Sequence, residues 1–181
     1  PCLVDVDAHS KALLFVSGAM PVNSYRHVGA KWFDVCSEWN LTRCAVDTAG
    51  AEPINVLAFV EGFLLACYSF ARYKTTGLFA VSSLTLKADI ESHALSSLVS
   101  LIDKVNWVKD AVNEPSNVLT TPKFIKRITN LLSGGNTSVD VLGMAKLQAL
   151  EMGGILAVNS GSSDEPAMVV AEYKPANAVN S

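Results

Sequence analysis

Short apolar runs that alternate with amphipathic patterns are the sequence feature that most constrains the fold. "KALLFVS" (11–17) and "RCAVD" (43–47) are typical of buried strands. Residues 25–39 and about 54–73 instead repeat apolar side chains at helical spacing, and Ser24 is suited to cap the first of these helices. This alternation predicts an α/β fold with a largely parallel sheet.

A polar stretch, "VNEPSNVLTTP" (112–122), interrupts the pattern late in the chain. Residues 89–111 before it predict a long helix, and after it Thr121 and Pro122 are suited to the start of another helix that ends at Gly134. The chain is therefore expected to contain two units joined by a helix. The predicted parts are an amino-terminal α/β domain, a linker helix and the start of a second domain, over residues 1–88, 89–112 and 113–181.

The remaining elements follow from local patterns. "GLFAVSSLTL" (77–86) predicts a third strand of the first unit. "MAKLQALEM" (144–152) predicts a short helix that stops at the following glycine pair. Three further strands are expected in the second unit, in "SVDVL", "ILAV" and "AMVVAEY", residues 138–142, 155–158 and 167–173.

Composition excludes several classes of protein. The chain has 181 residues, of which 50% are hydrophobic and 17% charged, so it buries much of its surface. The net charge is −3 and the basic residues are scattered, which argues against a nucleic-acid partner. In the most apolar stretch, Asn55, Glu61 and Arg72 interrupt the pattern, so a core helix is expected rather than a membrane span. No signal peptide is recognisable.

The cysteines do not predict a metal site. Cys2, Cys36, Cys44 and Cys67 form no Cys-x-x-Cys pair and have no histidine at ligand spacing. Free buried thiols in a reducing compartment are therefore expected. The three histidines are far apart in the sequence and are interpreted as surface or capping residues: His9, His27 and His93.

Other chemically suggestive residues favour structural interpretations. The close acidic pairs, Asp5 with Asp7 and Asp164 with Glu165, are expected in solvated loops. Ser160–Ser163 lacks both a nucleophile elbow and a phosphate-loop lysine, and it predicts a turn between strands. The tryptophans, at positions 32, 39 and 107, are expected in the core. No catalytic, metal-binding or substrate-binding residue is assigned.

Four collinear segments resemble the leucyl aminopeptidase (cytosol aminopeptidase) family. "VKDAVNEPSNVLTTPKFI" resembles the family's Asn-x-Pro-x-Asn element followed by Thr-Pro, at the entry to the catalytic domain. "VEGFLLACYSFARYKT" resembles a helix that ends in Tyr-x-Phe-x-x-Tyr-Lys, and "LEMGGILAVNSGSSDEPAMVVAEYK" resembles a Gly-Met-Gly-Gly segment that leads to a strand. "YRHVGAKWFDV" is similar to a weaker motif of the amino-terminal domain.

The chain departs from the family pattern in several places. Lys109 stands where arginine is common, and "NVLTTP" carries one extra residue. The family's metal-ligand motifs, Gly-Lys-Gly with Phe-Asp-Ser-Gly-Gly and Asn-Thr-Asp-Ala-Glu-Gly-Arg, are missing from this sequence. The resemblance therefore implies an internal piece: a macro-domain-like amino-terminal unit, the linker helix and the first lobe of the catalytic domain.

The resemblance also implies a function for the parent protein. Members remove amino-terminal residues from peptides with two divalent metal ions, zinc or manganese, and form homohexamers in the cytoplasm. This segment alone is expected to bind no metal, to lack activity and to act as a scaffold, without nucleic-acid or membrane partners. A degenerate, non-catalytic interaction protein is the second hypothesis. A small-molecule module that binds ADP-ribose-like ligands ranks last, because the first unit has no phosphate-cradling glycine loop.

Overall fold

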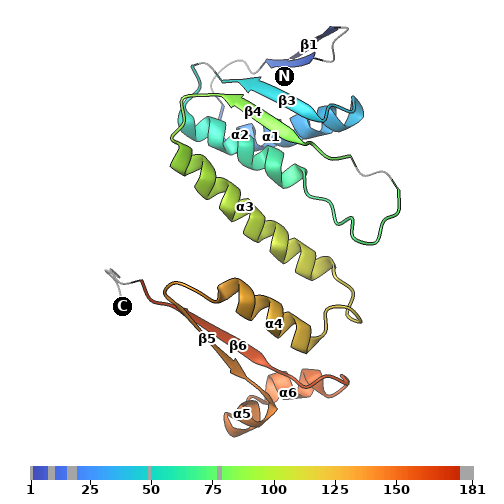
Figure 1. Ribbon diagram of the computed structural model, residues 1–181, viewed down its shortest axis with the longest axis vertical. Coiled ribbons are helices and arrows are strands. Elements are labelled where there is room, and N and C mark those ends of the chain that lie inside the picture. The colour runs from blue at the N-terminus through green and yellow to red at the C-terminus, as the bar shows by residue number, and fades with distance from the viewer. Residues whose placement is uncertain (1, 8–10, 16–19, 49, 77–78, 176–181) are drawn as a thin grey trace. The chain divides into compact units, whose positions relative to one another are not determined.

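The computed structural model describes residues 2–7, 11–15, 20–48, 50–76 and 79–175. It divides into two compact units, Pro1–Asp110 and Ala111–Ser181 (Figure 1). The helix α3 (Ser92–Asn113) runs across the division between them. The other elements of the first unit are β1 (Cys2–Asp7), β2 (Lys11–Phe15), α1 (Val22–Glu38), β3 (Arg43–Asp47), α2 (Pro53–Ala66) and β4 (Ser83–Lys87).

The second unit combines three helices with one strand pair. Its elements are α4 (Thr121–Leu132), β5 (Thr137–Leu142), α5 (Met144–Ala149), α6 (Gly153–Asn159) and β6 (Met168–Tyr173). The mixture of helices and strands in both units confirms the α/β prediction. α3 also confirms the long helix that was expected immediately before the polar stretch.

The strand pairing differs from the expected parallel sheet. β3 and β4 pair in parallel, with α2 between them in the chain. β1 with β2 and β5 with β6 are antiparallel. The prediction of a largely parallel sheet is thus wrong for the described strands. The connection between β5 and β6 contains α5 and α6, and β6 then pairs with β5 in the opposite direction.

Helices α1 and α2 pack backbone against backbone in the first unit. A Cβ atom on Gly29 would lie 2.0 Å from the Phe59 carbonyl oxygen, and one on Gly62 would lie 1.9 Å from the Arg26 carbonyl oxygen. Only glycine permits so close an approach. The Arg26 guanidinium also donates to the Glu61 carboxylate at 2.8 Å, which links the same two helices by an ion pair.

The core of the first unit forms around this helix pair. Both helices cover one side of the β3–β4 pair (Figure 1). Trp32 is 3% exposed, which confirms its predicted core position, whereas Trp39 is 37% exposed because α1 ends at Glu38. Trp107 is only half-buried on α3. The buried side chains of this core are Val28, Trp32, Cys36, Cys44, Phe59, Val60 and Phe63.

Helix α2 is shorter than its amphipathic pattern predicts. It ends at Ala66 rather than near residue 73. The Tyr68 hydroxyl donates to the Asp110 carboxylate at 3.0 Å, and the Lys109 ammonium lies 4.8 Å from the centre of the same ring. These contacts with α3 turn the chain away from the helix axis, so tertiary packing overrides the local pattern.

Two other boundaries in the first unit also differ from expectation. β4 begins at Ser83, later than predicted. Phe79 lies outside the strand because its ring packs against the Phe33 ring, with 5.8 Å between the ring centres. The start of the predicted strand, 77–78, lies outside the described residues. Ser24 is not the cap of α1, which begins at Val22.

Three predictions for elements of the second unit are wrong in detail. "ILAV" lies within α6, because Gly153 and Gly154 open that helix instead of only ending the one before it. α5 ends at Ala149, and Glu151 then adopts φ 52°. Thr120, rather than Thr121, precedes the first residue of α4, although Pro122 occupies the first turn as predicted.

Replacing Gly29 with alanine is expected to destabilise the first unit by about 2 kcal/mol or more, because the added methyl group forces α1 and α2 apart. Lys31→Ala is the matched control, since Lys31 is exposed on the same helix. Urea unfolding followed by tryptophan fluorescence reports on this unit, which contains Trp32, Trp39 and Trp107. Equal midpoints for the two variants would contradict the close packing.

Candidate functional site

The polar stretch between α3 and α4 forms an ordered turn. After α3 ends at Asn113, the amides of Val118 and Leu119 donate to the Pro115 carbonyl oxygen at 2.9 Å and 2.8 Å. The Phe124 amide then donates to the Thr120 carbonyl oxygen at 2.9 Å as α4 begins. Backbone hydrogen bonds therefore fix the path of the chain from one helix to the next.

A buried carboxylate lies within this turn. Glu114 has a fully buried side chain, and its carboxylate lies 3.6 Å from the Arg127 guanidinium of α4. Sequence reasoning missed this residue, although it is the one acidic side chain in an otherwise uncharged stretch. A buried charge is costly without partners, so the contact ties the turn to α4.

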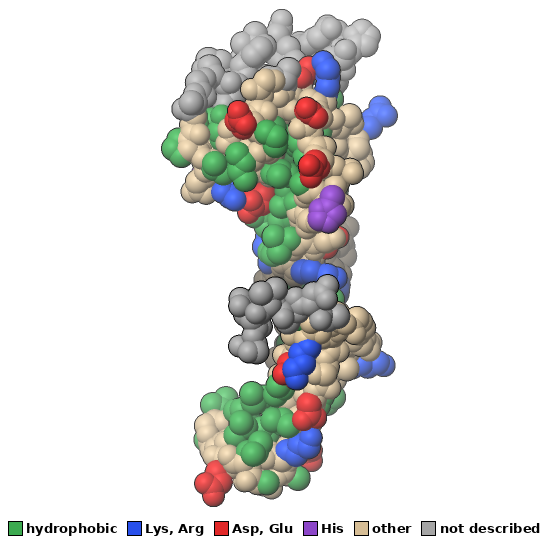
Figure 2. All heavy atoms as spheres, turned by 90° about the vertical axis from the view of Figure 1, so that its left-hand side faces the viewer, with side chains coloured by type: hydrophobic (Ala, Val, Ile, Leu, Met, Phe, Trp, Pro, Cys, Tyr) green, Lys and Arg blue, Asp and Glu red, His purple; other side chains and the backbone are tan. Residues whose placement is uncertain are grey.

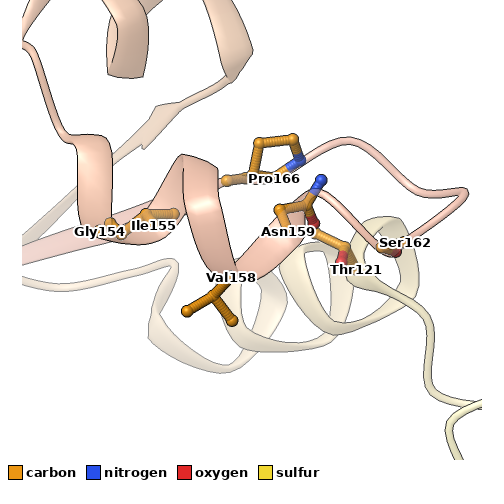
Figure 3. A pocket seen from close by; sticks show the side chains of 8 residues that line it. Thr121, Gly154, Ile155, Val158, Asn159, Ser162 and Pro166 are labelled. Atoms are coloured by element: carbon orange, nitrogen blue, oxygen red, sulfur yellow. The ribbon is translucent and has the colours of Figure 1, made fainter.

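A hollow of about 740 Å³ opens beside α6 and the start of α4 (Figure 3). Asn159 donates from its side-chain amide to the Asp164 carbonyl oxygen at 3.0 Å, and the Ser162 hydroxyl accepts from the Asp164 amide at 3.1 Å. Two polar side chains of the hollow, Asn159 and Ser162, are thus hydrogen-bonded to the loop that follows α6. The lining residues are Thr121, Gly154, Ile155, Val158, Asn159, Ser162, Pro166 and Ala167.

The chemistry available in this hollow is limited. No acid, base or thiol belongs to the described residues that line it. Ser160–Ser163 was expected to form a turn between strands, but it follows α6 and leads towards β6. The described lining residues provide the hydroxyls of Thr121 and Ser162 but no acid or base to activate them.

The acidic residues and histidines do not converge. Among the residues that the structure describes, no three His, Cys, Asp or Glu side chains form a group that could hold a metal ion. Asp5 and Asp7 lie in the strand β1 rather than in the predicted loop. The structure describes only the backbone of these two residues. Asp164 and Glu165 lie in the irregular segment before β6. The described side chains therefore do not fit a two-metal centre, and we derive no metal-dependent step from them.

The histidines confirm their surface interpretation where they are described. His27 and His93 are both exposed. The His27 ring lies 2.9 Å from the Asn23 carbonyl oxygen of the same helix, a local contact at a helix surface. His9 lies outside the described residues.

Three free thiols gather in the core of the first unit. The Cys36 and Cys44 sulfur atoms lie 3.1 Å apart, and both residues are buried. Burial, followed by contact with Cys44, raises the pKa of the Cys36 thiol. Burial and then Cys44 also raise the pKa of the half-buried Cys67 thiol to about 11. These three residues confirm the prediction of free thiols, and the raised pKa values of Cys36 and Cys67 favour the unreactive protonated form of those two thiols.

None of the described helices is both long enough and apolar enough to span a lipid bilayer. The apolar helix α2 has only 14 residues.

Comparison with known proteins adds a relationship that the geometry alone does not give. Residues 106–181 match the model of the cytosol aminopeptidase family, catalytic domain. The chain belongs to the cytosol aminopeptidase family. The match begins within α3 and continues through α4, β5, α5, α6 and β6.

Rickettsial proteins of the family are similar over most of this chain. A probable cytosol aminopeptidase of Rickettsia massiliae (strain Mtu5) is 33% identical over 150 residues, 74% of this chain and 30% of the relative. The cytosol aminopeptidase of Rickettsia prowazekii (strain Madrid E) is 38% identical over 130 residues, 68% of this chain and 26% of the relative. The chain thus spans less than a third of the length of these relatives.

Two solved structures share the fold. The bottromycin maturation enzyme BotP in complex with Mn matches with a TM-score of 0.74 and 23% identity, covering 88% of this chain and 35% of BotP. A mutant of tomato leucine aminopeptidase matches with a TM-score of 0.71 and 20% identity, covering 90% of this chain and 35% of that structure. At this identity the likeness supports the fold of the cytosol aminopeptidase family.

Arg127→Met is expected to lower the local stability of α4 by about 1–3 kcal/mol, because it removes a cation that lies 3.6 Å from the buried Glu114 carboxylate. Lys146→Met is the matched control: Lys146 pairs with Asp140 at 3.1 Å, but both side chains are largely exposed. Its loss is expected to cost less than about 1 kcal/mol. Hydrogen exchange, read by mass spectrometry, measures the first effect in peptides from α4 and the second in peptides from β5 and α5. Equal protection in the two variants would show that the buried contact adds nothing.

Alkaline pH is expected to destabilise the first unit partly through Cys67. An ordinary thiol has a pKa of 9.0, and the folded state raises that of Cys67 to about 11. Between these values the unfolded thiol loses its proton while the folded thiol keeps it, so ionisation favours unfolding as pH rises. Below pH 9 this contribution is unchanged.

Comparison of wild type with Cys67→Ala isolates this effect from other groups that titrate in the same range. Urea unfolding under reducing conditions, followed by circular dichroism, gives the free energy of unfolding at each pH. The stability advantage of wild type over the variant is expected to shrink from pH 9 to pH 11. A constant or growing advantage would contradict the burial of this thiol.

Proposed function

We propose that this chain supplies the amino-terminal unit and the beginning of the catalytic domain of a metal-dependent aminopeptidase. The whole enzyme is a hydrolase that removes amino-terminal residues such as leucine from peptides. The observation that carries this proposal is the match of residues 106–181 to the catalytic domain of the cytosol aminopeptidase family. The amino-terminal domain occupies residues 1–88, the linker helix 89–112, and the start of the catalytic domain 113–181.

The role of this chain within that enzyme is structural. The described side chains form no metal-binding group, and the hollow beside α6 has no titratable lining residue. The two divalent ions, zinc or manganese, are therefore held by residues beyond those described here. Manganese receives support from the similar fold of BotP, which is solved in complex with Mn. This chain would set the position of those residues through the buried contacts of the turn and α4.

The whole enzyme is proposed to be a homohexamer of the cytoplasm. Hydrophobic side chains gather on the surface of each unit (Figure 2). On α3, Leu101 is 58% exposed and Val108 is 53% exposed. Contact with other chains would cover such surface. The description of the relatives as cytosol aminopeptidases supports the compartment.

A non-catalytic interaction protein derived from an aminopeptidase is the second candidate. The lack of a metal-binding group among the described side chains fits this candidate as well as it fits the enzyme. The two candidates differ in the parent protein: intact metal ligands and turnover support the enzyme, and their loss supports the interaction protein.

A leucine-anilide assay tests the proposed division of roles. The isolated 181-residue chain is assayed with zinc, manganese or cobalt, beside the full-length parent under the same conditions. We expect chelator-sensitive turnover from the parent and none above background from the chain, because each metal needs several converging ligands.

Two outcomes would contradict this account. Metal-dependent turnover by the isolated chain, abolished by a chelator and unchanged after further purification, would reveal a catalytic site within it. A folded full-length parent that lacks turnover with all three metals would instead favour the non-catalytic candidate.

A further inference from the structure

The end of α1 and the start of β3 bring two thiols together in the core. Cys36 lies in the last turn of α1 and Cys44 is the second residue of β3. Their sulfur atoms are 3.1 Å apart, whereas a disulfide bond is about 2.0 Å long. The sulfur atoms therefore need to approach each other by only about 1 Å to form a bond.

The backbone around the two cysteines holds this arrangement. The Leu41 amide donates to the Cys36 carbonyl oxygen at 2.7 Å, which folds the chain back directly after α1. The Ser82 amide and hydroxyl both donate to the Thr42 carbonyl oxygen at 2.7 Å. The connection between the cysteines is thus anchored at Leu41 and Thr42, just before β3 begins. The pair forms through the fold of the first unit and not through a chance contact of mobile side chains.

We propose that Cys36 and Cys44 form a reversible disulfide when the protein meets a hydroperoxide, which makes this thiol pair a site of oxidative modification. Cys44 is 7% exposed and Cys36 is 0% exposed, so peroxide reaches Cys44 first. The Cys44 thiolate attacks one peroxide oxygen, the O–O bond breaks, and water leaves after protonation. The product is a sulfenic acid on Cys44.

Cys36 completes the reaction. Its sulfur attacks the sulfenic sulfur of Cys44, the S–O bond breaks, and a second water carries away the oxygen and the thiol proton. In total, two thiols and one hydrogen peroxide give one disulfide and two waters, with two electrons passing from sulfur to oxygen. A thiol reductant reverses the change by exchange. Because burial keeps Cys36 protonated, the reaction is slower than that of an exposed thiol.

Cys67 is the internal competitor and serves as the control. Burial and then the neighbouring Cys44 raise the pKa of Cys67. Among the described contacts, however, no hydrogen bond joins the Cys67 sulfur to Cys36 or Cys44. The proposal therefore assigns the bond to Cys36 and Cys44 alone. Cys67→Ser is expected to leave the bond unchanged, and Cys36→Ser is expected to abolish it.

Peptide mapping of the oxidised full chain tests this assignment directly. The protein is treated with hydrogen peroxide, blocked with an alkylating agent under denaturing conditions, and cleaved after lysine, arginine and glutamate. Because the Glu52–Pro53 bond resists cleavage, the three thiols separate into peptides 32–38, 44–61 and 62–72. We expect the first two peptides to be linked, at least tenfold more often than either is linked to the third, and to separate after reduction.

The wild-type map decides the question even where a serine variant fails to fold. Circular dichroism before and after peroxide shows that the mapped protein is folded. The proposal is overturned if Cys36 and Cys44 remain open to alkylation, if they are oxidised singly without a link, or if the link joins Cys67, Cys2 or a second chain. Persistence of the Cys36–Cys44 link in Cys67→Ser, with its loss in Cys36→Ser, supports it.

Discussion

The contact between α1 and α2 at Gly29 and Gly62 is the constraint on which the first unit depends. Each glycine faces a carbonyl oxygen of the opposite helix at a distance that no larger residue tolerates. The close approach brings Trp32 and Phe63 into one core, and that core covers a face of the β3–β4 pair. The turn between α1 and β3 then places Cys36 beside Cys44. One steric requirement thereby sets the helix pair and its core.

Much of the fold is predictable because hydrophobic spacing carries it. Buried residues at helical intervals define α1, and the amphipathic run before the polar stretch defines α3. The failures occur where contacts distant in sequence decide. Tyr68 bonds to Asp110 and shortens α2, and Phe79 packs against Phe33 where the strand β4 was expected to have begun. Single-sequence patterns contain no information on such contacts.

The candidate site shows the same limit. The family resemblance identifies the segment that contains the Asn-Glu-Pro turn, but it does not indicate that Glu114 is buried against α4. Nor does the spacing of cysteines 36 and 44 indicate that their sulfur atoms meet, because that depends on the turn between α1 and β3. The absence of a metal assignment follows from residue types alone, since the acidic residues form only two close pairs in the sequence.

The central claim is that this chain supports a metal-dependent catalytic site without holding the metal itself. Manganese titration of the isolated, folded chain, followed by electron paramagnetic resonance, tests this directly, because the signal of hydrated Mn²⁺ is lost when protein ligands replace water. The account predicts that micromolar manganese keeps its free signal at equimolar protein. Stoichiometric loss of that signal, restored by a chelator, would contradict it.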